Sequence, residues 1–146
     1  MCIRDSCGIE RIYVDKSLYR QFVDGFVDLT LKYKLGNPIE AGTNLGPMAR
    51  ASGAETVRNQ IAEALQRGAK ALVDEKKFAA SKPGTPYLAP QVLVDVDHRM
   101  AVMREESFGP VIGLMPVEND AAAVRLMNDT DYGLSLIHIS EPTRPY

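Results

Sequence analysis

The sequence predicts an α/β fold in which helices are layered on a sheet. Runs rich in β-branched and aromatic residues alternate along the chain with segments of helical periodicity. The order begins with strand, helix, loop, helix and strand, which is typical of α/β layering. The chain has 146 residues, the size of one domain, and 45% of them are hydrophobic, which is enough for a core.

The first half of the chain carries the elements that set this order. Residues 9–14 favour a strand because they are mostly β-branched or aromatic. Apolar residues then recur every three or four positions, which predicts a helix that buries Leu18, Phe22, Phe26, Leu29 and Tyr33. A second helix is predicted from about Ser52 to Gly68, with a buried stripe of Ala54, Val57, Ile61 and Leu65. Residues 69–73 return to a strand pattern.

The second half of the chain contains two further strands and a short helix. Residues 76–90 are polar and rich in proline and glycine, so we expect an excursion from the sheet. Strands are predicted at residues 91–96 and 111–117, and a helix at residues 120–127. Residues 128–133 have the composition of a turn.

Charge and composition limit the binding partners and the cellular compartment that we expect for the protein. Lysine and arginine number 17 against 19 acidic residues, a net charge of −2, so we expect no nucleic-acid partner and no anionic membrane surface. No apolar run approaches the roughly 20 residues that a membrane-spanning helix needs. Cys2 and Cys7 are too few for a disulfide framework, which favours a reducing compartment. The composition predicts a cytoplasmic protein.

Cys7 and the two histidines could act as a nucleophile or as metal ligands only together with other suitable side chains. A thiolate at Cys7, just before a predicted strand, could act as a nucleophile if its pKa were lowered or a base stood beside it. Pattern alone favours the alternative, a structural cysteine. His98 and His138 are not spaced with carboxylates or thiols as metal ligands would be, so we expect no metal site.

A pair of adjacent carboxylates precedes an aromatic residue and a Gly-Pro turn. Glu105 and Glu106 could bind a sugar diol, because a carboxylate accepts two hydroxyl hydrogens at once. Phe108 could then lie against a flat ring. The alternative is a solvated acidic pair ahead of a tight turn.

Five blocks, taken together and in order, resemble the aldehyde dehydrogenase superfamily. They are residues 7–14 (CGIERIYV), 36–38 (GNP), 45–48 (LGPM), 105–111 (EESFGPV) and 128–134 (NDTDYGL). The resemblance implies part of that family's catalytic domain, with helices layered on a mostly parallel sheet. It also implies oxidation of a small-molecule aldehyde to a carboxylic acid with NAD or NADP, and a homo-oligomeric full-length protein.

The resemblance assigns roles residue by residue. In the family a cysteine thiolate attacks the aldehyde to form a thiohemiacetal, hydride passes to the nicotinamide, and water activated by a glutamate hydrolyses the thioester. Glu106 matches the glutamate that holds the nicotinamide-ribose hydroxyls, and Phe108 matches the aromatic residue beside the nicotinamide. The family's arginine follows the nucleophile by five positions, so Arg11 places the nucleophile at Ser6, and Cys7 at the neighbouring position.

The two ends do not continue the pattern of the middle. Residues 1–6 and 136–146 resemble peptides that arise when a sequencing adapter is translated in frame, so we expect them to be non-native and residues 7–135 to be a partial catalytic domain. The adapter-like segment then replaces the nucleophile, and the isolated fragment is expected to be inactive. The alternative is a short protein that keeps this layer as a non-catalytic interaction module.

Overall fold

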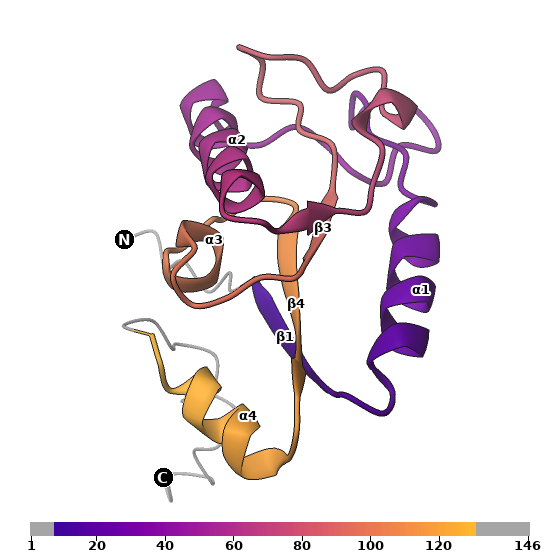
Figure 1. Ribbon diagram of the computed structural model, residues 1–146. Helices are drawn as coiled ribbons and strands as arrows, with labels where there is room; N and C mark the ends of the chain where they lie inside the picture. The colour runs from indigo at the N-terminus through magenta and orange to yellow at the C-terminus, as the bar shows by residue number, and fades with distance from the viewer. Residues whose placement is uncertain (1–7, 131–146) are drawn as a thin grey trace, which may run out of the picture.

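A computed structural model describes residues 8–130 of the chain, and it is an α/β domain (Figure 1). The elements are β1 (Arg11–Asp15), α1 (Tyr19–Thr30), α2 (Ala51–Gln66), β2 (Lys70–Ala71), the 3-10 turn η1 (Glu75–Lys77), β3 (Gln91–Val94), α3 (Ala101–Arg104), β4 (Val111–Val117) and α4 (Asp120–Met127). The predicted class is confirmed. The bounds of the last strand and the last helix also agree with the prediction.

The sheet is mostly parallel, as the resemblance implied. Its strand order is β1-β4-β3-β2, with β4 parallel to both β1 and β3, and β2 antiparallel to β3. Arg11 pairs with Gly113, and Gln91 pairs with Val111. Because these three strands run in one direction, the segments that lead into β1 and β4 lie at the same edge of the sheet.

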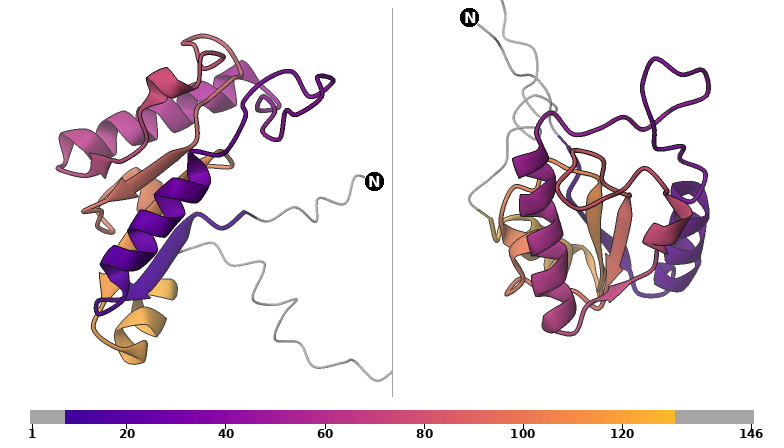
Figure 2. Two further views of the ribbon diagram at one scale, coloured as in Figure 1. Left: turned by 90° about the vertical axis from the view of Figure 1, so that its right-hand side faces the viewer. Right: turned by 90° about the horizontal axis from the view of Figure 1, so that it is seen from above.

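Helices cover both faces of the sheet, with α1 on one side and α2 and α3 on the other (Figures 1 and 2). The strands separate two cores. Leu93 packs with residues of α2 and α3, whereas its neighbours Val92 and Val94 pack with residues of α1. This division follows from the strand period of two, which turns successive side chains to opposite faces.

The stripe predicted to be buried on α1 is wrong for most of its members. Leu18, Phe22, Leu29 and Tyr33 are exposed by 57%, 37%, 63% and 47%. The side of α1 that packs on the sheet instead carries Tyr19, Val23, Phe26, Val27 and Thr30. Both sets have helical spacing, so periodicity predicted the helix without deciding which apolar side meets the sheet. The stripe of α2 is confirmed except for Leu65, which is 42% exposed.

Gly25 offers a test of the helical assignment of α1. It lies in the interior of the helix and is exposed, and a Cβ added there would meet no atom within 4 Å. We expect Gly25→Ala to raise the free energy of unfolding by about 0.5–1 kcal/mol, because alanine loses less backbone entropy in a helix. Urea unfolding of the chain measures the change. Gly113→Ala is the control, since its Cβ would collide with the buried Met103 Sδ and lower the stability. An unchanged or lowered stability in Gly25→Ala would contradict the assignment.

Two predicted strands end earlier than the sequence pattern indicated. β2 stops at Ala71 because the side chain of Gln91 takes over the pairing of Val73: its Oε1 accepts from the Val73 N–H at 3.0 Å and its Nε2 donates to the Val73 carbonyl at 3.0 Å. β3 stops at Val94 because Asp95 adopts a positive φ of 56°. That backbone conformation turns the chain out of the strand.

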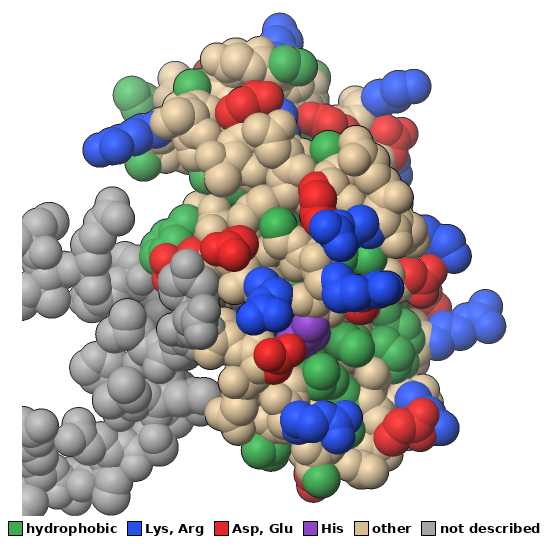
Figure 3. Space-filling model, turned by 60° about the vertical axis from the view of Figure 1, so that its left-hand side comes forward, with side chains coloured by type: hydrophobic (Ala, Val, Ile, Leu, Met, Phe, Trp, Pro, Cys, Tyr) green, Lys and Arg blue, Asp and Glu red, His purple; other side chains and the backbone are tan. Residues whose placement is uncertain are grey.

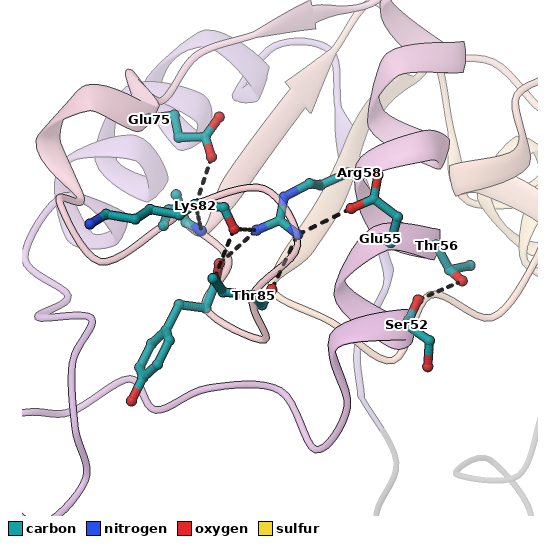
Figure 4. Close-up of polar contacts among 10 residues, drawn as sticks. Ser52, Glu55, Thr56, Arg58, Glu75, Lys82 and Thr85 are labelled. Carbon is teal, nitrogen blue, oxygen red and sulfur yellow. Dashed lines mark hydrogen bonds and ion pairs between the residues drawn. The ribbon is translucent and has the colours of Figure 1, made fainter.

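Arg58 of α2 fixes the polar excursion that precedes β3 (Figure 4). Its Nη2 donates to the carbonyls of Lys82 at 2.8 Å and Tyr87 at 2.7 Å, and its Nη1 donates to that of Thr85 at 3.3 Å. Glu55 lies 3.5 Å from the same guanidinium. One side chain therefore donates hydrogen bonds to three carbonyls of a loop that forms little regular structure of its own.

Replacing Arg58 should loosen this loop. We expect Arg58→Lys to lower the free energy of unfolding by about 1 kcal/mol, because an ammonium keeps the charge but lacks the planar fork that reaches several carbonyls. Urea unfolding gives the value, with Arg20→Lys on the exposed side of α1 as the matched control. If both variants unfold at the same denaturant concentration as the parent chain, the loop does not depend on the guanidinium.

Candidate functional site

The candidate site lies at the edge of the sheet where β1 and β4 begin. Gly8 and Ile9 lead into β1 and are exposed, and residues 105–110 lead into β4. The backbone joins the two segments, since the Gly113 N–H donates to the Glu10 carbonyl at 3.1 Å. The parallel pairing of β1 with β4 thereby brings together sequence positions about a hundred residues apart.

A tight turn at this edge is held in an uncommon conformation. Phe108 has a positive φ of 48°, a region that costs a bulky residue free energy. The carboxylate of Glu10 stabilises the turn, because its Oε1 accepts from the Ser107 N–H at 2.9 Å and from the Phe108 N–H at 3.0 Å. Hydrogen bonds to a charged acceptor are stronger than neutral ones. The turn is therefore fixed from the side of β1.

Gly109 fixes the same turn from the side of α2. A Cβ added at Gly109 would lie 2.8 Å from Val57 Cγ2 and 3.2 Å from Met48 Cε. Val57 is fully buried, so it has no room to move away. The turn packs directly on the helix, and only glycine permits that approach.

Two predicted binding residues project from this fixed turn. The side chain of Glu106 is exposed, and the ring of Phe108 is 55% exposed. An exposed carboxylate next to an exposed aromatic ring fits the nicotinamide-ribose end of a dinucleotide, since one can accept the diol and the other can lie against the base. Between them Ser107 is buried, and its hydroxyl has no hydrogen-bond partner among residues 8–130.

An apolar cavity of about 310 Å³ lies beside the edge. Ile9 and Pro110 line it from the two segments that enter the strands, and Phe26 and Tyr33 line it from α1 and the residues after it. Ile9 is 76% exposed although it is hydrophobic. The sheet edge thus presents apolar surface that includes Gly109 and Pro110 of the turn segment.

The structure places some of the predicted site residues and leaves others outside its range. Glu106 and Phe108 lie together on the turn, whereas Ser6 and Cys7 are outside the described residues. Glu10 and Arg11 were missed as contributors, although both contact the segment that carries Glu106. No local signal could have identified them, because their partners are more than ninety positions away in the sequence.

His98 serves a structural contact rather than a cluster of ligands. Its Nε2 lies 2.8 Å from the Tyr13 hydroxyl and its Nδ1 lies 2.7 Å from Asp129 Oδ2, which ties the residues after α4 to β1. Burial raises the pKa of the Tyr13 phenol. Within residues 8–130 no group of three or more potential metal ligands occurs. His138 falls outside that range.

The surface and the helices give two further observations. On the face drawn in Figure 3, acidic and basic side chains are interspersed rather than gathered by sign. None of the helices in the described part of the chain is long and apolar enough to cross a membrane.

Comparison with known proteins agrees with this fold. Residues 5–143 match the aldehyde dehydrogenase family, and the chain belongs to that family. The matched range includes most of residues 136–146, so the bounds of the domain stay a prediction. Among curated relatives, 3-sulfolactaldehyde dehydrogenase of Priestia aryabhattai is 35% identical over 127 residues, which cover 87% of this chain and 25% of that protein. 5-Carboxymethyl-2-hydroxymuconate semialdehyde dehydrogenase of Escherichia coli is 36% identical over 129 residues, covering 86% and 27%.

Solved structures show the same relationship. An aldehyde dehydrogenase of Physcomitrella patens in complex with the reaction product succinate is 36% identical, with a TM-score of 0.76, covering 85% of this chain and 24% of that one. Betaine aldehyde dehydrogenase of Staphylococcus aureus in complex with NAD+ is 29% identical, with a TM-score of 0.75, covering 86% and 25%. The chain therefore spans about a quarter of the length of the relatives that it matches.

Proposed function

We propose that the protein to which this chain belongs oxidises an aldehyde to a carboxylic acid with NAD or NADP. Membership of the aldehyde dehydrogenase family supports the reaction class. One geometric observation carries the proposal: the segment that follows position 6 contacts the turn of Glu106 and Phe108 directly, with Glu10 Oε1 2.9 Å from the Ser107 nitrogen. Glu10, four positions after the proposed nucleophile in the sequence, and the proposed cofactor residues therefore lie at one edge of the sheet.

The residues of this chain have two roles in the proposal. The Glu106 carboxylate would accept hydrogen bonds from the two hydroxyl groups of the nicotinamide ribose, and the Phe108 ring would lie beside the base. The bound cofactor supplies the redox chemistry by accepting a hydride. The turn, held by Glu10 and Gly109, fixes the direction from which Glu106 would reach the ribose, and fixed orientation of this kind lowers the barrier to reaction.

The residue at position 6 carries out the covalent step as the nucleophile. A cysteine thiolate there adds to the carbonyl carbon of the aldehyde and forms a thiohemiacetal, and the thioester left after hydride transfer is hydrolysed by water. This chain has Ser6 at that position, and a hydroxyl without a dedicated base is a far weaker nucleophile. We therefore propose that the chain as written is inactive, and that the full-length enzyme is a cytoplasmic homo-oligomer.

Two measurements test the proposal. Genomic DNA upstream of the codon for Gly8 should encode in frame Gly-Gln-x-Cys, the pattern that the resemblance implies around the nucleophilic cysteine. A stop codon there would favour the interaction module instead. The full-length protein should reduce NAD or NADP when mixed with aldehydes of the kinds that its relatives are named for, such as lactaldehyde, betaine aldehyde and semialdehydes. A full-length protein that binds neither cofactor would overturn the proposed function.

A further inference from the structure

Two consecutive residues at the start of β1 hold both ends of the segment that carries Glu106. Arg11 Nη1 donates to the Met103 carbonyl at 2.7 Å, at the end that precedes Glu106. Glu10 Oε1 accepts from the N–H groups of Ser107 and Phe108, at the end that follows it. The exposed Glu106 thus lies between two fixed points that come from one place in the sequence.

The hydrogen bonds to Glu10 offset the backbone strain at Phe108. Phe108 keeps its positive φ only while its surroundings favour that conformation over the extended one. A carboxylate that accepts two adjacent N–H groups gives that preference, because both hydrogen bonds require the two donors to point the same way. Without the carboxylate, the strain at Phe108 is unopposed on the β1 side. Gly109 would still pack on α2, so the turn would change direction rather than leave the domain.

We propose that Glu10 is a positioning residue for the nicotinamide site. This inference rests on the proposed function. Position 6 and Glu10 belong to the same short segment, so the carboxylate links the segment that bears the nucleophile to the turn that presents Glu106 and Phe108. Glu10 touches neither substrate nor cofactor in this role. It acts by keeping the direction of Glu106 fixed relative to the strand that follows the nucleophile.

The first experiment measures the contact in the chain itself. Amide hydrogen exchange, resolved by NMR, reports on the Ser107 and Phe108 N–H groups. We expect Glu10→Ala to accelerate exchange at both amides by about 10-fold or more, and Glu10→Gln, which keeps a neutral acceptor, by about 3-fold. Glu40→Gln, an exposed glutamate in the loop after α1, is the matched control and should leave both amides unchanged. Unchanged exchange in Glu10→Ala would overturn the proposal.

The second experiment separates positioning from a merely structural role. In the full-length enzyme, single-turnover formation of the reduced nicotinamide is measured per folded active site. We expect Glu10→Ala to slow that step by about 10-fold while KM for the aldehyde changes little, and Glu10→Gln to recover most of the rate. A structural role would lower the amount of folded enzyme and leave the rate per site as it was.

The outcomes distinguish this inference from the function on which it rests. If Glu106→Gln slows hydride transfer and Glu10→Ala does not, the positioning role is wrong and the proposed function stands. If the full-length protein reduces no nicotinamide with any aldehyde, the proposed function fails and the positioning role fails with it. In that case faster exchange at Ser107 and Phe108 in Glu10→Ala would leave the contact itself as a structural one.

Discussion

A full-length enzyme with serine at position 6 is expected to oxidise no aldehyde, and Ser6→Cys is expected to restore turnover by roughly 10³-fold or more. A free thiol is already a few per cent thiolate at pH 7 and is intrinsically nucleophilic, whereas a serine hydroxyl needs a base that takes its proton. The measurement is steady-state formation of the reduced nicotinamide, with purified full-length protein that contains residues 7–135 of this chain and carries either serine or cysteine at position 6.

The neighbouring thiol provides the control for this prediction. Cys7 follows position 6 directly, and the five-residue spacing before Arg11 that the resemblance implies assigns the nucleophile to position 6 rather than to Cys7. In the Ser6→Cys enzyme, Cys7→Ala should therefore leave turnover largely intact. The opposite result is a Ser6 enzyme that turns over an aldehyde and loses that activity on Cys7→Ala. That result would show that the nucleophile is assigned one position too early and that Cys7 is the nucleophile.

The sequence predicted best the elements whose ends are marked by local chemistry. The last helix begins where expected because the Asn119 Oδ1 accepts from the Ala122 N–H at 2.9 Å and caps it. β4 has the predicted bounds because Pro110 precedes it and polar residues follow it. In both cases the signal lies within a few positions of the boundary, where a reader of the sequence can see it.

Features that depend on distant contacts could not be predicted. Gln91 shortens β2 through hydrogen bonds to Val73, eighteen positions away. The buried side of α1 is chosen by the sheet, and the helix itself has two apolar sides of similar spacing. The resemblance assigned Glu106 and Phe108. The role of Glu10 depends on its contact with a turn 97 positions later, which no local sequence pattern indicates. The sequence therefore predicts the exposed residues of the candidate site. The structure adds the contacts that hold the turn on which they lie.

Glu106→Gln in the full-length enzyme is expected to slow hydride transfer by roughly 10- to 100-fold, or about 1.4–2.7 kcal/mol. Glutamine keeps the shape of the side chain and one acceptor oxygen, but it removes the charge that strengthens hydrogen bonds to the ribose hydroxyls. Because the turn is fixed by Glu10 and Gly109, the rest of the site should not shift to compensate. Single-turnover kinetics give the rate of the step, and equilibrium titration gives the affinity for the cofactor.

Glu105→Gln is the matched control for this prediction, because the two glutamates are adjacent, have the same side chain and are both exposed. The Glu105 N–H donates to the Ala101 carbonyl at 2.8 Å, which places Glu105 at the end of α3 and one residue short of the turn. Neighbouring residues in extended backbone project in different directions, so only Glu106 should reach the ribose. If both variants slow hydride transfer equally, the effect comes from the local negative charge and not from a specific contact. If neither variant changes the rate or the cofactor affinity, Glu106 is a solvated surface acid and the diol is bound elsewhere.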